Sequence, residues 1–352
     1  GDVYKRQTLI PNAGATGDGH AYFFYCNPHP SGSDITWNFG QDSSFANPLL
    51  TRQGNSDSGD SETDFYYTPP DGFLACNATN LADTTLSPNQ NEQATDYFNA
   101  IIYTGDGADN RTLTGVGFQP DWTWIKNRSN DGFNHILTDS TRGAGKELFS
   151  DDNTEEDTIN TNKLEAFASD GFTLGASPHG SVNSNTHTYV AWNWHVNGGT
   201  TSTNNDGDIQ TTVQVNQKAG ISIITYTGTG TQSDTVGHGL GVKPKWVLVK
   251  SRSEAQNWHV YHEKLHPSAP EDYAVFLNAP NARSSSSANL FNSTAPTATV
   301  MSVGNDNSSN KSSTTYVMYL FAEIEGYSKF GAYEGNSNAD GTYVFTGFRP
   351  AM

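Results

Sequence analysis

Apolar side chains recur at every second position in several short stretches of the chain. In residues 121–126, the side chains of Trp122, Trp124 and Lys126 fall on one face of an extended segment, and those of Thr123 and Ile125 fall on the other. A second stretch, residues 188–196, places four large apolar side chains on one face: Val190, Trp192, Trp194 and Val196. A period of two predicts β-strands with one packed face.

The rest of the chain favours strands over helices. No sustained apolar pattern repeats at the helical spacing of 3.6 residues, and 34 Gly and 15 Pro residues interrupt the sequence. Charged residues make up only 16% of the chain, against about 25% in an average soluble domain, so Ser, Thr, Asn and Gly supply the polar surface. For 352 residues, we expect an all-β protein of about two to three domains.

One block of sequence occurs more than once. GVGFQPDWTWIKNRS at Gly115–Ser129 returns as GHGLGVKPKWVLVKSRS at Gly237–Ser253, and its beginning returns at Gly347–Met352. A Tyr-x-Gly turn precedes each copy, and its Tyr lies 17, 18 and 17 residues before the Pro of the block. The period is longer than the roughly 20 to 50 residues of solenoid repeats, so each copy is long enough to be a small domain.

These copies define the predicted domains. We predict three of them in this part of the chain: β-sandwich repeat 1 at residues 95–199, β-sandwich repeat 2 at residues 219–326, and the truncated start of repeat 3 at residues 327–352. The first two should share one strand order, with Pro120 superposed on Pro244 and Tyr189 on Tyr316.

Aromatic residues at period two mark the predicted core. The apolar face of residues 188–196 has a counterpart in the second copy at Val317, Tyr319 and Phe321. Preservation of an apolar face is what a core strand requires. We therefore expect these aromatic side chains to be largely buried rather than available to a ligand: Trp122, Trp124, Trp192, Trp194, Trp246, Tyr319 and Phe321.

The formal net charge of −18 argues against nucleic acid or an anionic membrane surface as a partner, because both require a basic face. No stretch approaches the roughly 20 apolar residues of a membrane-spanning helix. Two cysteines, Cys26 and Cys76, are too few for a disulfide framework, and whether they pair is left open.

The N-terminal region does not repeat. Residues 1–7 contain DVYKRQ, which resembles a translated sequencing-adapter end, so we interpret them as a scar and expect truncation at both ends of a metagenomic fragment. In residues 8–86, a strand ending in Asn-Phe-Gly at residue 40 is followed by the aromatic run Phe65–Tyr67, a Pro-Pro turn and Gly72-Phe73. This order resembles the C-terminal part of SPRY-like domains, which implies a fragment of a concanavalin-type sandwich.

No strong catalytic motif is present. The sequence lacks G-x-S-x-G, H-E-x-x-H, a P-loop and any Cys/His metal cluster, so we predict no enzyme activity, no cofactor and neither catalytic nor metal-binding residues. His135, Asp139 and Ser140 lie too close together along one strand and turn to form a catalytic triad.

Two acidic segments have simple structural interpretations. Asp151–Asp157 is typical of a solvated loop. The loop Gly105–Asn110 holds Asp106 and Asp109 beside a Gly turn, which leaves calcium binding open, although a turn favours the same residue types.

Arg and His recur at a spacing of seven residues, as Arg128 with His135 and as Arg252 with His259. One interpretation is a shallow binding site for an acidic sugar or carboxylate, with Arg as the bidentate donor. The loops expected beside this site are Gly105–Asn110 and Gly228–Asp234. The alternative is that each Arg binds strand-end carbonyls or a neighbouring acidic side chain.

The order of motifs Y-T-G, G-F-x-P-D-W, I-K-N-R-S, D-G-F-T-L-G and T-Y-V-A-W, after an SPRY-like segment, resembles tail-fibre and tail-associated structural proteins of marine bacteriophages. The resemblance implies a virion protein, located outside the host cell, that contacts other tail proteins and a glycan or protein of the host surface. It implies a homotrimer in the intact protein. Lys243 and Lys245 depart from the pattern, because the first copy has Gln119 and Asp121 there.

Two other classes of function are kept open. A secreted carbohydrate-binding module of a larger polysaccharide-active protein would show the same strands and polar surface. A glycan hydrolase would need two facing carboxylates roughly 5 to 10 Å apart.

Overall fold

A computed structural model of the chain describes residues 43–44, 51–56, 63–69, 86, 91–158, 163–176, 180–285, 289–348 and 350. The chain divides into two compact units, Gly1–Asp83 and Thr84–Met352. In the described part of the chain, no helix is long and apolar enough to cross a membrane.

In the first unit, the described residues form one small structure. Asn55 and Phe65 make an antiparallel bridge, and the carboxylate of Asp64 accepts the backbone N–H groups of Ser43 and Gly54 at 3.0 and 2.8 Å. The predicted adapter scar at residues 1–7, the strand ending at residue 40, Cys26 and Cys76 all lie outside the described residues. The SPRY-like fold of residues 8–86 therefore stays a prediction.

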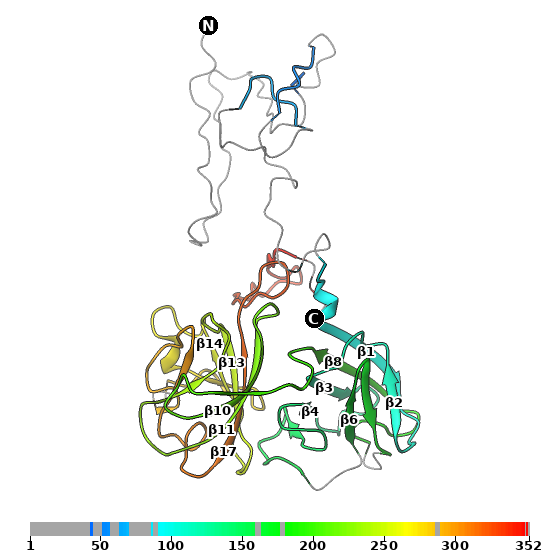
Figure 1. Ribbon diagram of the computed structural model, residues 1–352, viewed down its shortest axis with the longest axis vertical. Coiled ribbons are helices and arrows are strands. Elements are labelled where there is room, and N and C mark those ends of the chain that lie inside the picture. The colour runs from blue at the N-terminus through cyan, green and yellow to red at the C-terminus, as the bar shows by residue number, and fades with distance from the viewer. Residues whose placement is uncertain are drawn as a thin grey trace. The chain divides into compact units, whose positions relative to one another are not determined.

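The second unit is built from short antiparallel strands (Figure 1). Its first half contains η3 (Ala94–Asp96), β1 (Phe98–Thr104), β2 (Arg111–Thr114), β3 (Trp122–Asn127), β4 (Ile136–Asp139), β5 (Leu148–Phe149), β6 (Leu164–Ala168), β7 (Gly171–Leu174) and β8 (Thr188–Trp194). The connector holds β9 (Ser202–Asn204). The second half contains β10 (Thr211–Asn216), β11 (Ile221–Thr227), β12 (Asp234–Gly237), β13 (Trp246–Ser251), β14 (His259–His262), η4 (Pro270–Asp272), β15 (Val275–Phe276), β16 (Val300–Val303) and β17 (Thr315–Phe321). The predicted all-β class is confirmed.

The two halves have large sheets with the same strand order. In the first half the order is β1-β8-β3-β4-β5, and in the second half the order β11-β17-β13-β14-β15 occurs within a seven-stranded sheet that β10 and β9 extend. The registers also agree, because Tyr103 pairs with Tyr189 in one half and Tyr226 with Tyr316 in the other.

A small sheet covers one face of each large sheet. In the first half, β2-β7-β6 packs on the large sheet around Ile125, Phe172 and Ala191. In the second half, β12-β16 packs around Val236, Met301 and Met318. Each half is thus a pair of packed sheets, consistent with a β-sandwich.

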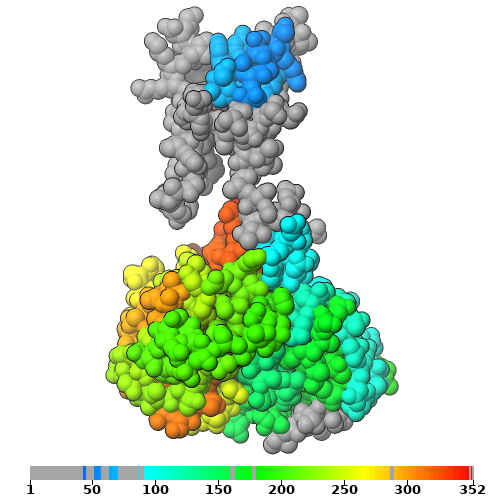
Figure 2. Space-filling view, viewed as in Figure 1, coloured from blue at the N-terminus to red at the C-terminus, as the bar shows by residue number. Residues whose placement is uncertain are grey.

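The large sheets pack against each other through their remaining faces. One hydrophobic cluster contains residues of both halves, and in it the ring of Trp122 stacks on that of Tyr319, with centroids 4.6 Å apart. Figure 2 shows the halves meeting as one continuous surface. The large sheets are therefore covered on both sides, which explains why six of the seven residues of β17 are buried.

The burial of the predicted core aromatics differs from residue to residue. Trp122, Tyr319 and Phe321 are buried, as predicted. The other four are only partly buried: Trp124, Trp192, Trp194 and Trp246. The reason is that this face of the strands lies between the halves, where cover is incomplete, whereas the opposite face of β8, with Tyr189 and Ala191, lies inside the first sandwich.

A buried carboxylate fixes the connector between the halves. Asp121 accepts hydrogen bonds from the four successive backbone N–H groups of residues 196–199, at 2.6 to 2.9 Å, and from the hydroxyl of Ser140 at 2.8 Å. Gln214 of β10 accepts two of the same N–H groups. The connector is therefore bound to both halves. At the matching position of the second half, Lys245 forms an ion pair with Glu263 instead.

Candidate functional site

The structure does not bring the first predicted pair together. Arg128 is exposed, its backbone N–H donates to the carbonyl of Thr188, and within the described residues its guanidinium makes no hydrogen bond or ion pair. His135 donates its backbone N–H to Asp151, and its ring lies 3.9 Å from the same carboxylate. Burial lowers the pKa of the His135 ring, although the charge of Asp151 acts to raise it.

Arg252 is occupied by a carboxylate of the protein itself. Its Nε and Nη2 atoms donate to the two oxygens of Glu156 at 2.9 and 2.8 Å, and Arg142 donates to the same group at 2.7 Å. Burial acts to raise the pKa of Glu156, but the bonds and charges of Arg252 and Arg142 outweigh it and hold the pKa below its ordinary value. Arg252 therefore follows the structural alternative. Asp151–Asp157 is largely exposed, as predicted, but its Glu156 binds the other half through Arg252.

His259 is not the counterpart of His135. The hairpin β13–β14 pairs Val249 with His259, whereas β3–β4 pairs Ile125 with Ile136, because the turn is one residue shorter in the second half. The ring of His259 packs edge-on against Phe276, and burial lowers its pKa. The equal spacing in the sequence therefore does not correspond to an equal position in the fold.

The two loops expected beside these residues are held by hydrogen bonds to backbone carbonyls of the protein itself. The backbone carbonyl of Asn183 accepts the N–H of Gly107, and that of Asn310 accepts the N–H of Gly230, both at 2.8 Å. In the first loop, Asp106 pairs with Arg111 at 3.3 Å. Within the described ranges, no group of three His, Cys, Asp or Glu side chains is arranged to hold a metal ion.

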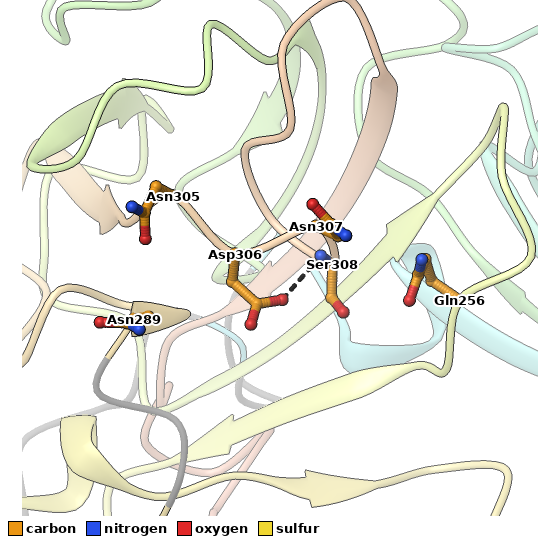
Figure 3. A pocket seen from close by; sticks show the side chains of 6 residues that line it. All are labelled: Gln256, Asn289, Asn305, Asp306, Asn307 and Ser308. Atoms are coloured by element: carbon orange, nitrogen blue, oxygen red, sulfur yellow. Dashed lines mark hydrogen bonds between the residues drawn. The ribbon is translucent and has the colours of Figure 1, made fainter.

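A polar hollow in the second half is the candidate site, and we call it the amide pocket. It has a volume of about 410 Å³ and is lined by six residues: Gln256, Asn289, Asn305, Asp306, Asn307 and Ser308. Three segments form it, namely the turn before β14, the chain near residue 289, and the loop between β16 and β17. Figure 3 shows the carboxylate of Asp306 between Asn289 on one side and Gln256 on the other.

The backbone of this pocket is rigidly held. Asp306 accepts the N–H of Ser308 at 2.7 Å through its carboxylate, and its carbonyl accepts the N–H of Asn310 at 2.8 Å. The hydroxyl of Tyr316 donates to the carbonyl of Asn307 at 2.7 Å and accepts the N–H of Lys311. The ring of Tyr316 is in turn stacked inside the sandwich core. The backbone of the loop is therefore anchored to the core, while the side chains of Asn305 and Asn307 are exposed.

The amide groups of the pocket are unengaged. Among the described residues, the side chains of Gln256, Asn289, Asn305 and Asn307 make no hydrogen bond within the protein. Buried amides elsewhere, such as that of Asn193, are consumed in internal bonds. An amide offers both donors and an acceptor, which matches the hydroxyl groups of a sugar.

The described residues at the corresponding place of the first half are arranged differently. There the hydroxyl of Tyr189 donates to the carbonyl of Gly180, as Tyr316 does to Asn307. The ring of Phe133 lies directly beside Gly180, because a Cβ added at Gly180 would be 2.4 Å from that ring. Sequence reasoning missed the pocket because its residues come from three separate segments, although the run NDNSSN at Asn305–Asn310 was a signal.

Comparisons with known proteins place the chain in a family. No curated protein and no solved structure matches it. The profile of one family, described as a domain of unknown function (DUF7483), matches residues 93–352, which include both halves of the second unit. Because this match covers well over half of the sequence, the chain belongs to the DUF7483 family.

Proposed function

We propose that this protein recognises a glycan through the amide pocket and does not turn it over. The observation that carries the proposal is the set of four unengaged amide side chains around a hollow with a rigid backbone. Its volume of about 410 Å³ lies within the roughly 300 to 1,000 Å³ of typical small-ligand sites. Asp306 is the single carboxylate of the lining, whereas glycoside hydrolysis uses a facing pair.

The ligand class is a neutral sugar rather than the acidic sugar that the arginine pairs suggested. Asp306 would repel a sugar carboxylate, and Arg252 is already bound to Glu156. The net charge of −18 would also disfavour the approach of an acidic sugar.

The biological setting of the proposal is a bacteriophage virion, in a tail fibre or tail-associated protein that touches the host surface. The shared strand order of the two halves supports two tandem copies of one sandwich. Since the ring of Phe133 lies at the corresponding place of the first half, avidity would come from a homotrimer, in which linked sites gain about 10² to 10⁴ in affinity. A secreted carbohydrate-binding module is the alternative, and the genes beside this one would separate the two.

A glycan array with the full chain tests the proposal. Replacing Asn305 and Asn307 by Ala should weaken binding about 30-fold, since two hydrogen bonds at about 1 kcal/mol each amount to about 2 kcal/mol. Gln232→Ala is the matched control, because Gln232 is an exposed amide outside the pocket. Unchanged binding by the double variant would refute the site, and released sugar would assign the protein to the enzymes.

A further inference from the structure

Three charged side chains meet in the interior of the first half. Glu147 and Asp157 face each other through two backbone hydrogen bonds of 3.0 and 2.9 Å. The ammonium of Lys163 contacts the Glu147 carboxylate and lies 3.2 Å from Oδ2 of Asp157. Its other side faces the ring of Phe149, whose centroid is 5.1 Å away. The side chains of Glu147, Lys163 and Asp157 are 1%, 7% and 23% exposed, so the group is largely shielded from water.

The fold itself does not require these charges. In the second half the corresponding bridge joins Ala274 to Ser284. In the second half, the carbonyl of Leu290 accepts the backbone N–H of the residue after β16. In the first half, the carbonyl of Lys163 accepts the backbone N–H of the residue after β7. The same backbone arrangement is therefore built with Ala, Ser and Leu, and the charged set of the first half needs its own explanation.

We propose that Lys163 and Asp157 join in an intramolecular amide bond, with Glu147 as the proton carrier. The neutral amine of Lys163 attacks Cγ of Asp157, the new N–C bond forms, and one carboxyl oxygen leaves as water. The ammonium supplies both protons of that water, and Glu147 transfers them from Nζ to the departing oxygen. The ion pair and the amide plus water contain the same atoms and charge, so no oxidant or other reactant is required.

The geometry provides what this condensation needs. Oδ2 is bonded to the carbon under attack, so a distance of 3.2 Å to Nζ is close to a reactive arrangement. Apart from Lys163, no donor in the described residues reaches the Glu147 carboxylate. Burial raises the pKa of Glu147 to about 7, so that it can accept and release a proton at neutral pH.

The environment also favours the product. Two carboxylates and one ammonium meet in a largely shielded place, where charges are costly even when paired. The reaction removes one carboxylate and the ammonium, and a neutral amide takes their place. Glu147 is then the single charge left in the group, and it takes up a proton from solvent to become an uncharged carboxylic acid.

Mass spectrometry of the purified full chain tests the bond. The intact mass should be lower than the mass of the sequence by one water molecule, and trypsin should fail to cleave after Lys163. Lys163→Arg and Asp157→Ala should restore the full mass, and Glu147→Gln should prevent or slow the loss of water. Asp157→Asn should yield the same final mass as the wild type, because the identical amide then forms with loss of ammonia.

A fold control comes from the chain itself. The triple variant Glu147→Ala, Asp157→Ser, Lys163→Leu copies the second half and should keep the wild-type circular dichroism spectrum while showing no mass loss. A wild-type mass equal to that of the sequence would overturn the proposal. Loss of water that persists in Lys163→Arg would overturn it as well, because a cyclised aspartate elsewhere would then be the source.

Discussion

The ionic bridge between the two halves provides a sharp test of the packing described above. Glu156 comes from the first half, its side chain is 6% exposed, and it binds Arg142 of its own half and Arg252 of the other. Glu156→Gln keeps the shape of the side chain but removes the charge. Among the described residues, the fully buried guanidinium of Arg142 then retains only Asp139 as a charged partner.

The expected loss is about 3 kcal/mol in the free energy of unfolding. Breaking a buried ion pair by removing one partner costs about 3 to 5 kcal/mol, and the remaining Asp139 places this variant at the lower end. The effect depends on pH. The folded-state pKa of Glu156 lies below the unfolded value of about 4.3, so its contribution is present above that pH and is lost as the pH falls through the folded pKa.

Urea unfolding followed by tryptophan fluorescence measures the loss, since six of the seven tryptophans lie in the second unit. The difference between wild type and Glu156→Gln should be largest near pH 7 and should narrow below about pH 4. Glu155→Gln is the control, because the neighbouring Glu155 is exposed. If the two variants lose the same small amount, the bridge does not hold the halves together.

Three further measurements address the core, a buried lysine and the pocket loop. Trp258→Ala should cost about 3 to 5 kcal/mol because Trp258 is fully buried between the halves, and Trp192→Ala should cost less because Trp192 is partly exposed; equal urea midpoints would contradict this. Burial lowers the pKa of Lys250 to about 8, below its unfolded value of about 10.4. The free energy of unfolding of the wild type should therefore rise from pH 8 to about 9.5. A rise of the same size in Lys250→Met would show that Lys250 is not its cause. Tyr316→Phe removes the bond to the carbonyl of Asn307 and should speed amide hydrogen exchange in residues 305–311 while β1 to β8 stay protected; unchanged exchange there would mean that the loop is held by other contacts.

The strands were predictable from local pattern, and their surroundings were not. Apolar residues at period two correctly placed β3, β8 and β17. The pattern cannot say what covers a face, so the side of β8 that bears Trp192 was assigned to a sandwich core although it lies between the halves. Trp258 was not identified, because one large residue in a short polar stretch carries no period.

The binding site was even less predictable from local sequence than the surroundings of the strands. Arg252 and Glu156 are 96 residues apart, and only the packing of the halves makes the acidic loop a partner for the arginine. The spacing of seven residues suggested a repeated site, but a turn shorter by one residue moved His259 onto the position of Ile136. Local spacing predicts turns and strands, whereas a binding site depends on contacts between distant segments.

The shared aromatic interface also has a consequence during synthesis. The first half ends its last strand at Trp194, and β17 ends at Phe321, so 321 − 194 = 127 residues must follow before the partner sheet is complete. At about 5 to 20 residues per second, the ribosome needs roughly 6 to 25 s for this stretch. During that interval the face that bears Trp122 is open to water and to neighbouring nascent chains, which makes it the surface on which a chaperone, or aggregation, would act first.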